Sequence, residues 1–404
     1  MRPSRRDFLK LASVCGISLS VSPVASAQVP DIAASETLPG RGVSHPALGR
    51  VDGVAKVTGG KLYAADFRAA DLPGWPATTH HALLVRAPGA THLYEGLDLA
   101  ALPPEATPTL VVTAEDINRI GARVPEFYAG DLFCPVGTTP LYLGQPVALL
   151  LFETFDAYDV ARVAFRDGNL LKFGKETGPR TGANYGAFRF TRVAGAEPGA
   201  PDIYSPLQEG WISPGFVDGG SGRPIWRVLP DEKGPDYVKG AAYGEAIRAE
   251  LEAVNPAVLT LDRSFATQSV DPMFLEPETG LAWYDPAAKK LDMVIGVQSP
   301  FEAAEAVAHL LGEVQADHKP ATINTRFCYV GGGFGGRDHT PFPLYVALAA
   351  LFFPGRPVRL AHDRFQQFQG GVTRHACTLR SLIVVDGKSG LITGFADYHV
   401  LEGG

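Results

Sequence analysis

The sequence predicts a mixed fold, α+β and α/β, arranged as two successive domains. Three observations support this prediction. The chain of 404 residues exceeds the size at which a single hydrophobic core stops growing, about 250–300 residues. Apolar runs of strand length alternate with segments of helical spacing. A glycine-rich stretch, VGGGFGGRD (330–338), lies between a predicted strand and a predicted helix.

Residues 1–27 predict an export signal that is removed by cleavage. Arg5 and Arg6 precede a short apolar run that ends in the small-residue pattern ASA (25–27). Because this run is shorter than the ~20 residues that cross a bilayer and contains Pro23, we expect no stable membrane span. The paired arginines predict the twin-arginine route, which carries folded proteins, and therefore a periplasmic location.

Composition excludes several classes of protein. Hydrophobic residues make up 46% and charged residues 20%, as in soluble globular proteins. A net charge of −7 argues against a nucleic-acid partner. The four cysteines have neither zinc nor iron–sulfur spacing, so we expect no such site in this chain. Cys15 would leave with the signal, and the other three are either lone buried thiols or include one disulfide: Cys134, Cys328 and Cys377.

Residues 47–166, which follow a proline-containing linker (28–46), predict the first α/β domain. Its strand candidates are ALLVRA (82–87), TLVVTA (109–114) and PVALLLF (146–152), and its helix candidate is DAYDVARVAF (156–165). Residues 167–236 are rich in glycine, proline and aspartate, and they predict an irregular insertion.

Residues 237–404 predict the second α/β domain. Helices are expected at 237–254, 299–312 and 343–353, the last two with Pro300 in a first turn and with Gly312 and Pro354-Gly355 at the stops. Strand candidates are 258–265, 280–285, 291–298 and 325–330. The segment LIVVDGKSGLITGFADYHVLEGG (382–404) predicts a hairpin.

The glycine loop predicts a binding site. Glycine adopts positive φ and lets backbone N–H groups converge on an anion or an oxo group. The alternative is a tight strand-to-helix turn, which five glycines around Phe334 disfavour. A P-loop is disfavoured because Arg337-Asp338 stands where Lys-Ser/Thr is needed, and a dinucleotide-binding fold lacks its acidic residue about 20 residues further on.

Six sequence blocks carry a resemblance to a known family: GRVDGVAKVTGGKLYAADF (49–67), YLGQPVALLLFET (142–154), MFLEPETGLAWYD (273–285), VQSPFEAAEAVAHLLG (297–312), VGGGFGGRD (330–338) and GRPVRLAHDRFQQF (355–368). In this order they resemble the molybdopterin-binding large subunits of the xanthine dehydrogenase and aldehyde oxidase family. The resemblance implies an α/β-hammerhead domain at 47–166 and a first molybdopterin-binding domain, truncated at its C-terminus, at 237–404. The insertion at 167–236 departs from the family pattern.

The resemblance also implies roles for individual residues. Gln298 would hydrogen-bond an oxygen ligand of the molybdenum, and a glycine–phenylalanine loop would pass beside the metal and its pterin: Gly332, Gly333, Phe334, Gly335 and Gly336. Asp338 is a candidate for substrate contact, where other members carry a glutamate, or it caps the next helix. Arg337 replaces the more usual lysine. Glu276 matches a family position and is either structural or catalytic.

Cofactor and chemistry follow from the same resemblance. The expected cofactor is molybdopterin with molybdenum, in the cytosine dinucleotide form. Because the pterin holds the metal, no side chain is expected as a direct ligand, including those of His339, His362 and His375. The family oxidises aldehydes or N-heterocycles with water as the oxygen source. Its base is a glutamate that would lie beyond Gly404, so no catalytic base is expected in this chain.

The resulting hypothesis is the N-terminal part of a molybdenum hydroxylase subunit, inactive without a polypeptide that carries the C-terminal molybdenum domain. Electrons would pass to a separate 2Fe-2S subunit, with an FAD subunit as a further candidate partner, because this chain lacks a cysteine cluster. The chain is either one half of a split subunit or a truncated one. The alternative hypothesis is a non-catalytic remnant or assembly component that retains the fold.

Overall fold

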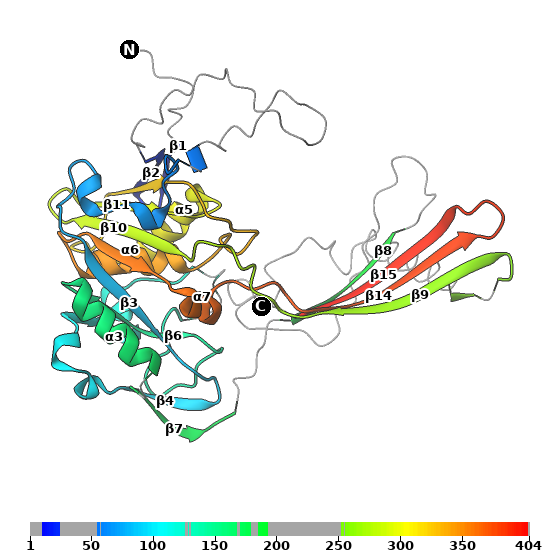
Figure 1. Cartoon of the computed structure of the whole chain (residues 1–404), viewed down its shortest axis with the longest axis horizontal. Coiled ribbons are helices and arrows are strands. Elements are labelled where there is room, and N and C mark those ends of the chain that lie inside the picture. The colour runs from blue at the N-terminus through cyan, green and yellow to red at the C-terminus, as the bar shows by residue number, and fades with distance from the viewer. Residues whose placement is uncertain are drawn as a thin grey trace, which may run out of the picture. The chain divides into compact units, whose positions relative to one another are not determined.

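The computed structural model describes residues 10–24, 55–56, 58–125, 128, 131–167, 170–178, 185–192, 252–253 and 255–402. The chain forms two compact units (Figure 1). Unit 1 comprises Met1–Pro125, Asp131–Pro179 and Pro272–Gly371, and unit 2 comprises Glu126–Gly130, Arg180–Asp271 and Val372–Gly404. Unit 1 thus takes segments from both of the predicted α/β domains.

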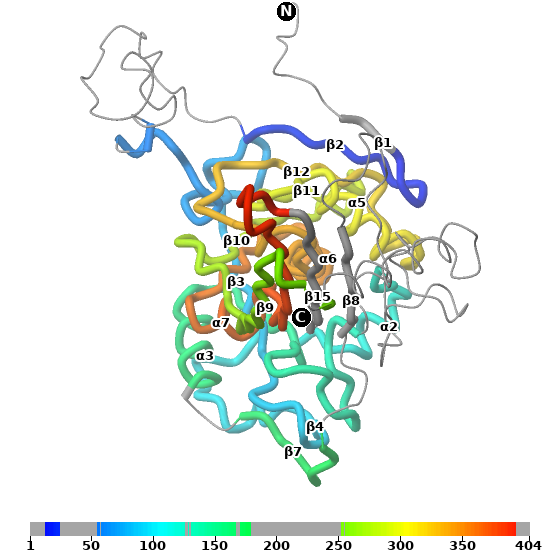
Figure 2. The backbone as a smooth tube through the Cα atoms, turned by 90° about the vertical axis from the view of Figure 1, so that its right-hand side faces the viewer, coloured from blue at the N-terminus to red at the C-terminus, as the bar shows by residue number. Residues whose placement is uncertain are grey.

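Nine of the described strands form one sheet in unit 1 (Figures 1 and 2). In spatial order they are β1 (Lys10–Val14), β2 (Ile17–Pro23), β12 (Thr322–Phe327), β11 (Lys290–Ile295), β10 (Thr279–Asp285), β13 (Val358–Ala361), β3 (His80–Arg86), β6 (Pro146–Phe152) and β5 (Leu110–Val112). The β2–β12, β12–β11 and β13–β3 pairs are parallel, and the others are antiparallel. The β13–β3 pair joins the strands predicted for two domains into a single sheet.

Helices cover this sheet where its strands are most apolar. All seven residues of β6 are buried, as expected of a continuous apolar run covered on both faces. Helix α6 (Phe342–Phe352) packs against β10, β11 and β13, and α5 (Pro300–Leu311) packs against β12 and β2. Helix α3 (Phe155–Asp167) packs against β3 and β6.

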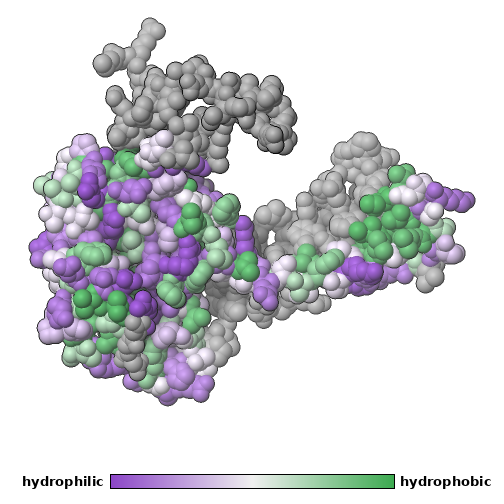
Figure 3. Space-filling model, viewed as in Figure 1, coloured by the Kyte–Doolittle hydropathy of each residue, from purple (hydrophilic) through white to green (hydrophobic). Residues whose placement is uncertain are grey.

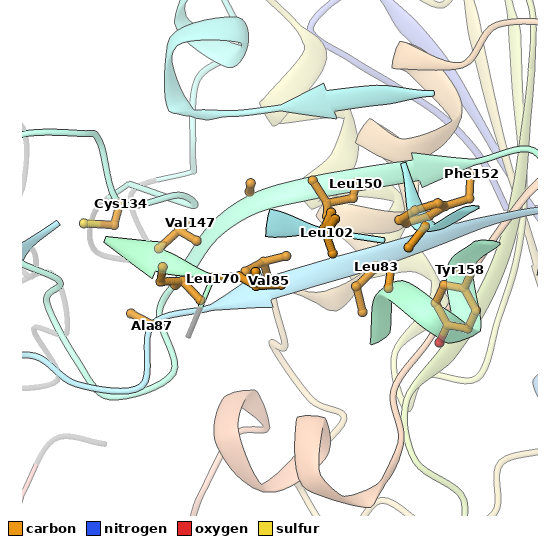
Figure 4. Close-up of a cluster of buried hydrophobic side chains, with 14 of the residues drawn as sticks. Leu83, Val85, Ala87, Leu102, Cys134, Val147, Leu150, Phe152, Tyr158 and Leu170 are labelled. Carbon is orange, nitrogen blue, oxygen red and sulfur yellow. The ribbon is translucent and has the colours of Figure 1, made fainter. Parts of the chain in front are cut away.

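A buried cluster fills the space between α3 and the β3–β6 pair (Figure 4). Leu83 and Val85 come from β3, Leu150 and Phe152 from β6, and Tyr158 from α3. Burying side chains of this size stabilises a domain by about 1.5–3 kcal/mol each. This cluster holds α3 against the β3–β6 pair.

Shorter elements complete unit 1. They are the 3-10 helices η1 (Ala64–Asp66), η2 (Ala69–Asp71), η3 (Leu99–Ala101) and η4 (Pro104–Ala106), the α-helices α2 (Ala114–Ile120) and α7 (Arg364–Gly370), and the two-stranded sheet of β4 (His92–Leu97) and β7 (Leu171–Glu176). Asp363 caps α7 by accepting a hydrogen bond from the backbone of Gln366 at 2.9 Å. Gly121 ends α2 at φ 78°.

Unit 2 contains a four-stranded antiparallel sheet among its described residues. Its order is β8 (Tyr185–Arg192), β15 (Ile392–Glu402), β14 (Cys377–Asp386) and β9 (Val258–Thr267). The β14–β15 pair is the hairpin that the sequence predicted at the end of the chain. Strand β9 lies at one edge of this sheet.

Part of the predicted export signal forms a hairpin in unit 1. Strands β1 and β2 pair with each other, and β2 pairs in parallel with β12. Ile17 and Leu19 are fully buried, and Ser20 donates a hydrogen bond to Asn324 at 2.8 Å. The export signal remains a prediction, and the apolar alternation of its residues suits a sheet edge as well. Among the described helices, every one falls short of the length and apolar character that a bilayer crossing requires.

Most predicted elements form close to their expected bounds, and three expectations need comment. The strand expected at 325–330 ends at Phe327, because the chain then turns and Gly331 pairs with Glu276. The stretch at 167–236, expected to be irregular, contains β7 and β8, whose polar sequences pair with distant strands. The helix expected at 237–254 lies outside the described residues, apart from 252–253. All four cysteines are free thiols.

Candidate functional site

The glycine loop connects β12 to α6 in unit 1. Three of its residues have positive φ: Gly332 at 102°, Phe334 at 50° and Gly335 at 87°. A left-handed conformation costs a non-glycine residue about 1–2 kcal/mol, so the position of Phe334 is strained. The side chain of Phe334 is nevertheless 66% exposed. The loop therefore holds an aromatic ring at its surface against a conformational cost.

Four of the loop glycines make room for side chains of this same chain, and the closest approaches are at Gly331 and Gly333. A Cβ on Gly331 would lie 2.4 Å from the Cβ of Glu276, and a Cβ on Gly333 would lie 2.3 Å from Oε1 of Gln298. Both distances are far below van der Waals contact, so a larger residue would displace these side chains. The close approach that the sequence indicated is made, on this side of the loop, by Glu276 and Gln298.

The amide of Gln298 is held in one orientation by the loop. Its Oε1 accepts hydrogen bonds from the backbone N–H groups of Gly335 at 2.9 Å and Arg337 at 3.3 Å, and the backbone N–H of Gln298 donates to Arg337 O at 3.4 Å. Two donors aimed at one atom identify that atom as the oxygen. The Gln298 side chain is exposed, and its Nε2 group donates no hydrogen bond to another described residue.

Glu276 braces the other end of the loop. Its carboxylate accepts from Gly331 N at 2.9 Å and pairs with the Arg337 guanidinium at 3.2 Å, and its backbone N–H donates to Gly331 O at 3.3 Å. The side chain is mostly buried. Of the two roles left open for Glu276, the geometry favours the structural one.

Arg337 links three segments of unit 1. Its fully buried side chain donates to Gly296 O at 2.7 Å, to Glu276 O, and to Pro277 O at 3.3 Å. The guanidinium also lies 4.6 Å from the centre of the Phe274 ring. Burial lowers the pKa of Arg337, although the carboxylates of Glu276 and Glu278 oppose this shift. The planar group makes several directed hydrogen bonds at once, which a lysine ammonium matches less well.

Asp338 binds the start of α5 instead of capping the next helix. Its carboxylate accepts from the Ser299 hydroxyl at 3.3 Å, whereas the residue at the N-cap of α6 is Pro341. The carboxylates of Asp338 and Glu302 and the ring of His339 lie within 4.8 Å of one another at the surface. Exposed groups of this kind are common without an ion. Substrate contact by Asp338 stays a prediction.

A buried polar cluster lies behind the glycine loop, and the sequence did not single it out. Glu278 accepts from Gln367 at 3.4 Å and lies 3.9 Å from His362, whose Nε2 accepts from Arg86 at 3.3 Å. Burial raises the pKa of Glu278, and burial together with Arg86 lowers the pKa of His362 well below its usual value. The one available signal was a glutamate, Glu278, directly before an apolar strand.

Comparison with known proteins adds to this geometry. Residues 231–404 match the family model of the molybdopterin cofactor-binding domain. The chain therefore carries a molybdopterin cofactor-binding domain. Its resemblance to the xanthine dehydrogenase and aldehyde oxidase family, first seen in six sequence blocks, is confirmed. Among curated proteins, no relative matches the sequence.

Solved molybdenum enzymes share the fold. Quinoline 2-oxidoreductase from Pseudomonas putida 86 aligns with a TM-score of 0.52 and 20% identity, over 84% of this chain and 37% of that one. CO dehydrogenase from Oligotropha carboxidovorans gives a TM-score of 0.53 and 19% identity over 83% and 37%. Aldehyde oxidoreductase from Desulfovibrio gigas gives 0.50 and 21% over 83% and 32%. The chain thus spans less than two fifths of the length of these relatives.

These comparisons confirm the mixed α/β fold and, over residues 231–404, the molybdopterin class of cofactor-binding domain. The hammerhead assignment, the cytosine dinucleotide form and the cofactor contacts of individual loop residues stay predictions. The structure brings Gln298 together with Gly333, Gly335 and Arg337 around one amide group. It places His362 in the buried cluster, away from the loop surface.

Proposed function

We propose that this chain is the N-terminal part of a molybdenum hydroxylase subunit that oxidises an aldehyde or an N-heterocycle with water as the oxygen source. The observation that carries the proposal is the Gln298 amide, fixed by two backbone donors beside a strained glycine loop in a molybdopterin-binding domain. The names of two relatives, quinoline 2-oxidoreductase and aldehyde oxidoreductase, support the two substrate classes.

The loop residues fit the proposed cofactor. The Nε2 group of Gln298 offers donors to an oxygen acceptor, which suits an oxygen bound to the metal. The exposed ring of Phe334 offers a flat apolar surface to a pterin, and Gly335, at positive φ, brings no side chain beside it. When bound, the cofactor supplies the two-electron oxidation of the substrate carbon.

The protein's own contribution at this site is positioning. Because Gly335 N–H and Arg337 N–H hold the Gln298 oxygen, the amide does not need to reorganise to present its donors. Arg337 and Glu276 hold the loop that supplies those N–H groups. Supporting contacts of this kind fix the geometry of a binding site. The donors of Gln298 are therefore ready in place before any ligand arrives.

The remaining components come from other polypeptides under this proposal. A second polypeptide supplies the C-terminal molybdenum domain and its base glutamate, and a 2Fe-2S subunit, with or without an FAD subunit, accepts the electrons. The twin-arginine route delivers the loaded complex to the periplasm. Replacement of both Arg5 and Arg6 by lysine is then expected to leave the protein in the cytoplasm, as cell fractionation and immunoblotting would show. Normal periplasmic levels would contradict the export assignment.

One experiment separates the enzyme from its alternative. The chain is produced together with the polypeptide encoded by the coding sequence that follows it, and molybdenum and the released pterin nucleotide are quantified. The expected result is stoichiometric molybdenum, and aldehydes or N-heterocycles that take up labelled oxygen from water in the presence of an artificial electron acceptor. A folded complex without molybdenum would favour the non-catalytic scaffold, which the short span of this chain relative to its relatives also permits.

A further inference from the structure

An apolar stripe runs along one face of the unit 2 sheet, over β9 and β14. Residues directly opposite each other in an antiparallel pair share a face, and three such pairs are entirely apolar: Leu259 with Val385, Leu261 with Ile383, and Phe265 with Leu379. The three β9 members are 58%, 38% and 56% exposed, in the order of the chain. Large apolar side chains in this arrangement normally form the covered face of a sheet.

The end of the sheet at the start of β9 extends this stripe. Leu391, in the turn between β14 and β15, and Ile392, the first residue of β15, are also exposed, and the register places them beside the first residues of β9. Figure 3 shows hydrophobic residues gathered on this part of unit 2. We name the eight residues the β9 face: Leu259, Leu261, Phe265, Leu379, Ile383, Val385, Leu391 and Ile392. The three β14 members are half-buried and the other five residues are exposed. Contiguous apolar patches of this kind mark interaction sites.

The edge of β9 lacks most of the features that protect edge strands. Among the described strands β9 pairs only with β14, and that ladder runs without a bulge from Val258–Asp386 to Thr267–Cys377. Natural edges are usually short, interrupted by proline or bulges, or strongly charged. The ten residues of β9 include no proline and two charged residues, Asp262 and Arg263, and Asp262 already pairs with Arg380 at 2.7 Å. We therefore expect another polypeptide segment to cover β9.

We propose that the β9 face is the docking surface for the polypeptide that carries the remainder of the molybdenum-enzyme fold. This inference rests on the proposed function for its partner. The solved relatives have more than three fifths of their length without a counterpart in this chain. The β9 face lies in the part of unit 2 that the cofactor-binding domain match includes. A partner that completes the fold would cover apolar surface and supply acceptors to Arg263, the charge in the middle of the stripe.

Two matched double variants test the docking surface. Leu261→Glu with Phe265→Glu places two charges on the β9 face. Ser264→Glu with Ala266→Glu places the same two charges on the opposite face of the same strand, where these residues and their β14 partners Arg380 and Thr378 are exposed. The probe is the polypeptide encoded by the coding sequence that follows this chain, produced separately and titrated by isothermal calorimetry. The first variant is expected to weaken binding at least about tenfold, and the control variant to bind as the unchanged chain does.

The outcomes show whether the β9 face binds the second polypeptide or a second copy of this chain. Equal affinity of both variants would overturn the proposal, as would the absence of any coding sequence for the rest of the fold. A symmetric dimer of this chain, cross-linked through a Phe265→Cys pair and persisting with excess probe, would assign the face to a second copy instead. Molybdenum content is measured on the same complex. A complex that needs the β9 face but contains no molybdenum keeps the docking surface and overturns the proposed function.

Discussion

Strands β6 and β9 differ sharply in how far their residues are buried. Every residue of β6 is buried, whereas nine of the ten residues of β9 are exposed. Both are rich in residues that favour strands, and both were predicted from sequence close to their observed bounds. Strand formation and burial are thus separate properties. β6 has its neighbours within unit 1, whereas β9 has one strand neighbour among the described residues.

The difference shows which of the two sheets is covered by elements of its own unit. Unit 1 covers its sheet with α3, α5 and α6, and its core clusters consist of side chains from the unit itself. The unit 2 sheet leaves the β9 face exposed. Stability measurements on each region, made with and without the second polypeptide, therefore sharpen the comparison, and the following variants are ordered from the largest expected effect to the smallest.

The largest effect is expected from truncation in β6. Leu150→Ala removes three buried carbons from the core cluster and should lower the free energy of unfolding by about 4 kcal/mol. Leu261→Ala in β9 should lower it by less than about 1 kcal/mol, because that side chain is already partly in water. Chemical denaturation of both variants measures the two losses in unfolding free energy. Losses of similar size would contradict the difference in burial between the two strands. The loss at Leu261 should grow once the second polypeptide is bound.

Removal of the Arg337 guanidinium is expected to have the next largest effect. Arg337→Met leaves three backbone carbonyls without this donor and the Glu276 carboxylate without its cation, and should destabilise unit 1 by about 3 kcal/mol. Arg337→Lys is the control that keeps the charge and should recover part of the loss. Hydrogen exchange at the Gly335 amide should accelerate in the methionine variant, because the loop that holds Gln298 loosens. Unchanged exchange there would contradict the positioning role.

Gly335→Ala probes the loop, the exposed part of unit 1. At φ 87° an alanine is strained by about 1–2 kcal/mol, so thermal stability should fall slightly. The Gly335 N–H donates to Gln298, so the shift of the loop should also turn the amide and lower molybdenum occupancy in the co-produced complex. Metal analysis beside thermal unfolding measures both. Full occupancy with a lowered melting temperature would reduce the loop to a simple turn.

The smallest effect concerns pH. Burial raises the pKa of Glu278, so the folded state retains a proton that the unfolded state releases above the ordinary carboxyl pKa of about 4.3. Glu278 therefore contributes stability that is fully present below that pH and is lost as pH rises through the raised value. The stability of Glu278→Gln relative to the unchanged chain should increase over this range. Denaturation at a series of pH values checks the slope, and parallel curves would refute the shift.

The sequence predicted individual elements better than it predicted their assembly. The periodicity of α5 and the apolar run of β6 identified both elements, because a helix face or a buried strand is a local pattern. The sheet order was not accessible, since β13 pairs with β3 across a separation of more than 270 residues and no local pattern records that partner. The role of Arg337 was missed for the same reason, because its acceptors lie on segments remote in sequence.

The β1–β2 hairpin has a consequence for the predicted cleavage of the export signal. Residues predicted to leave with the export signal occupy the edge of the nine-stranded sheet, bury Ile17 and Leu19, and satisfy the backbone of β12. Cleavage after Ala27 would remove two strands and leave β12 as an open template for another strand. The precursor and the processed protein would then differ in fold as well as in length. In that case the leader would serve as a temporary edge of the precursor's sheet.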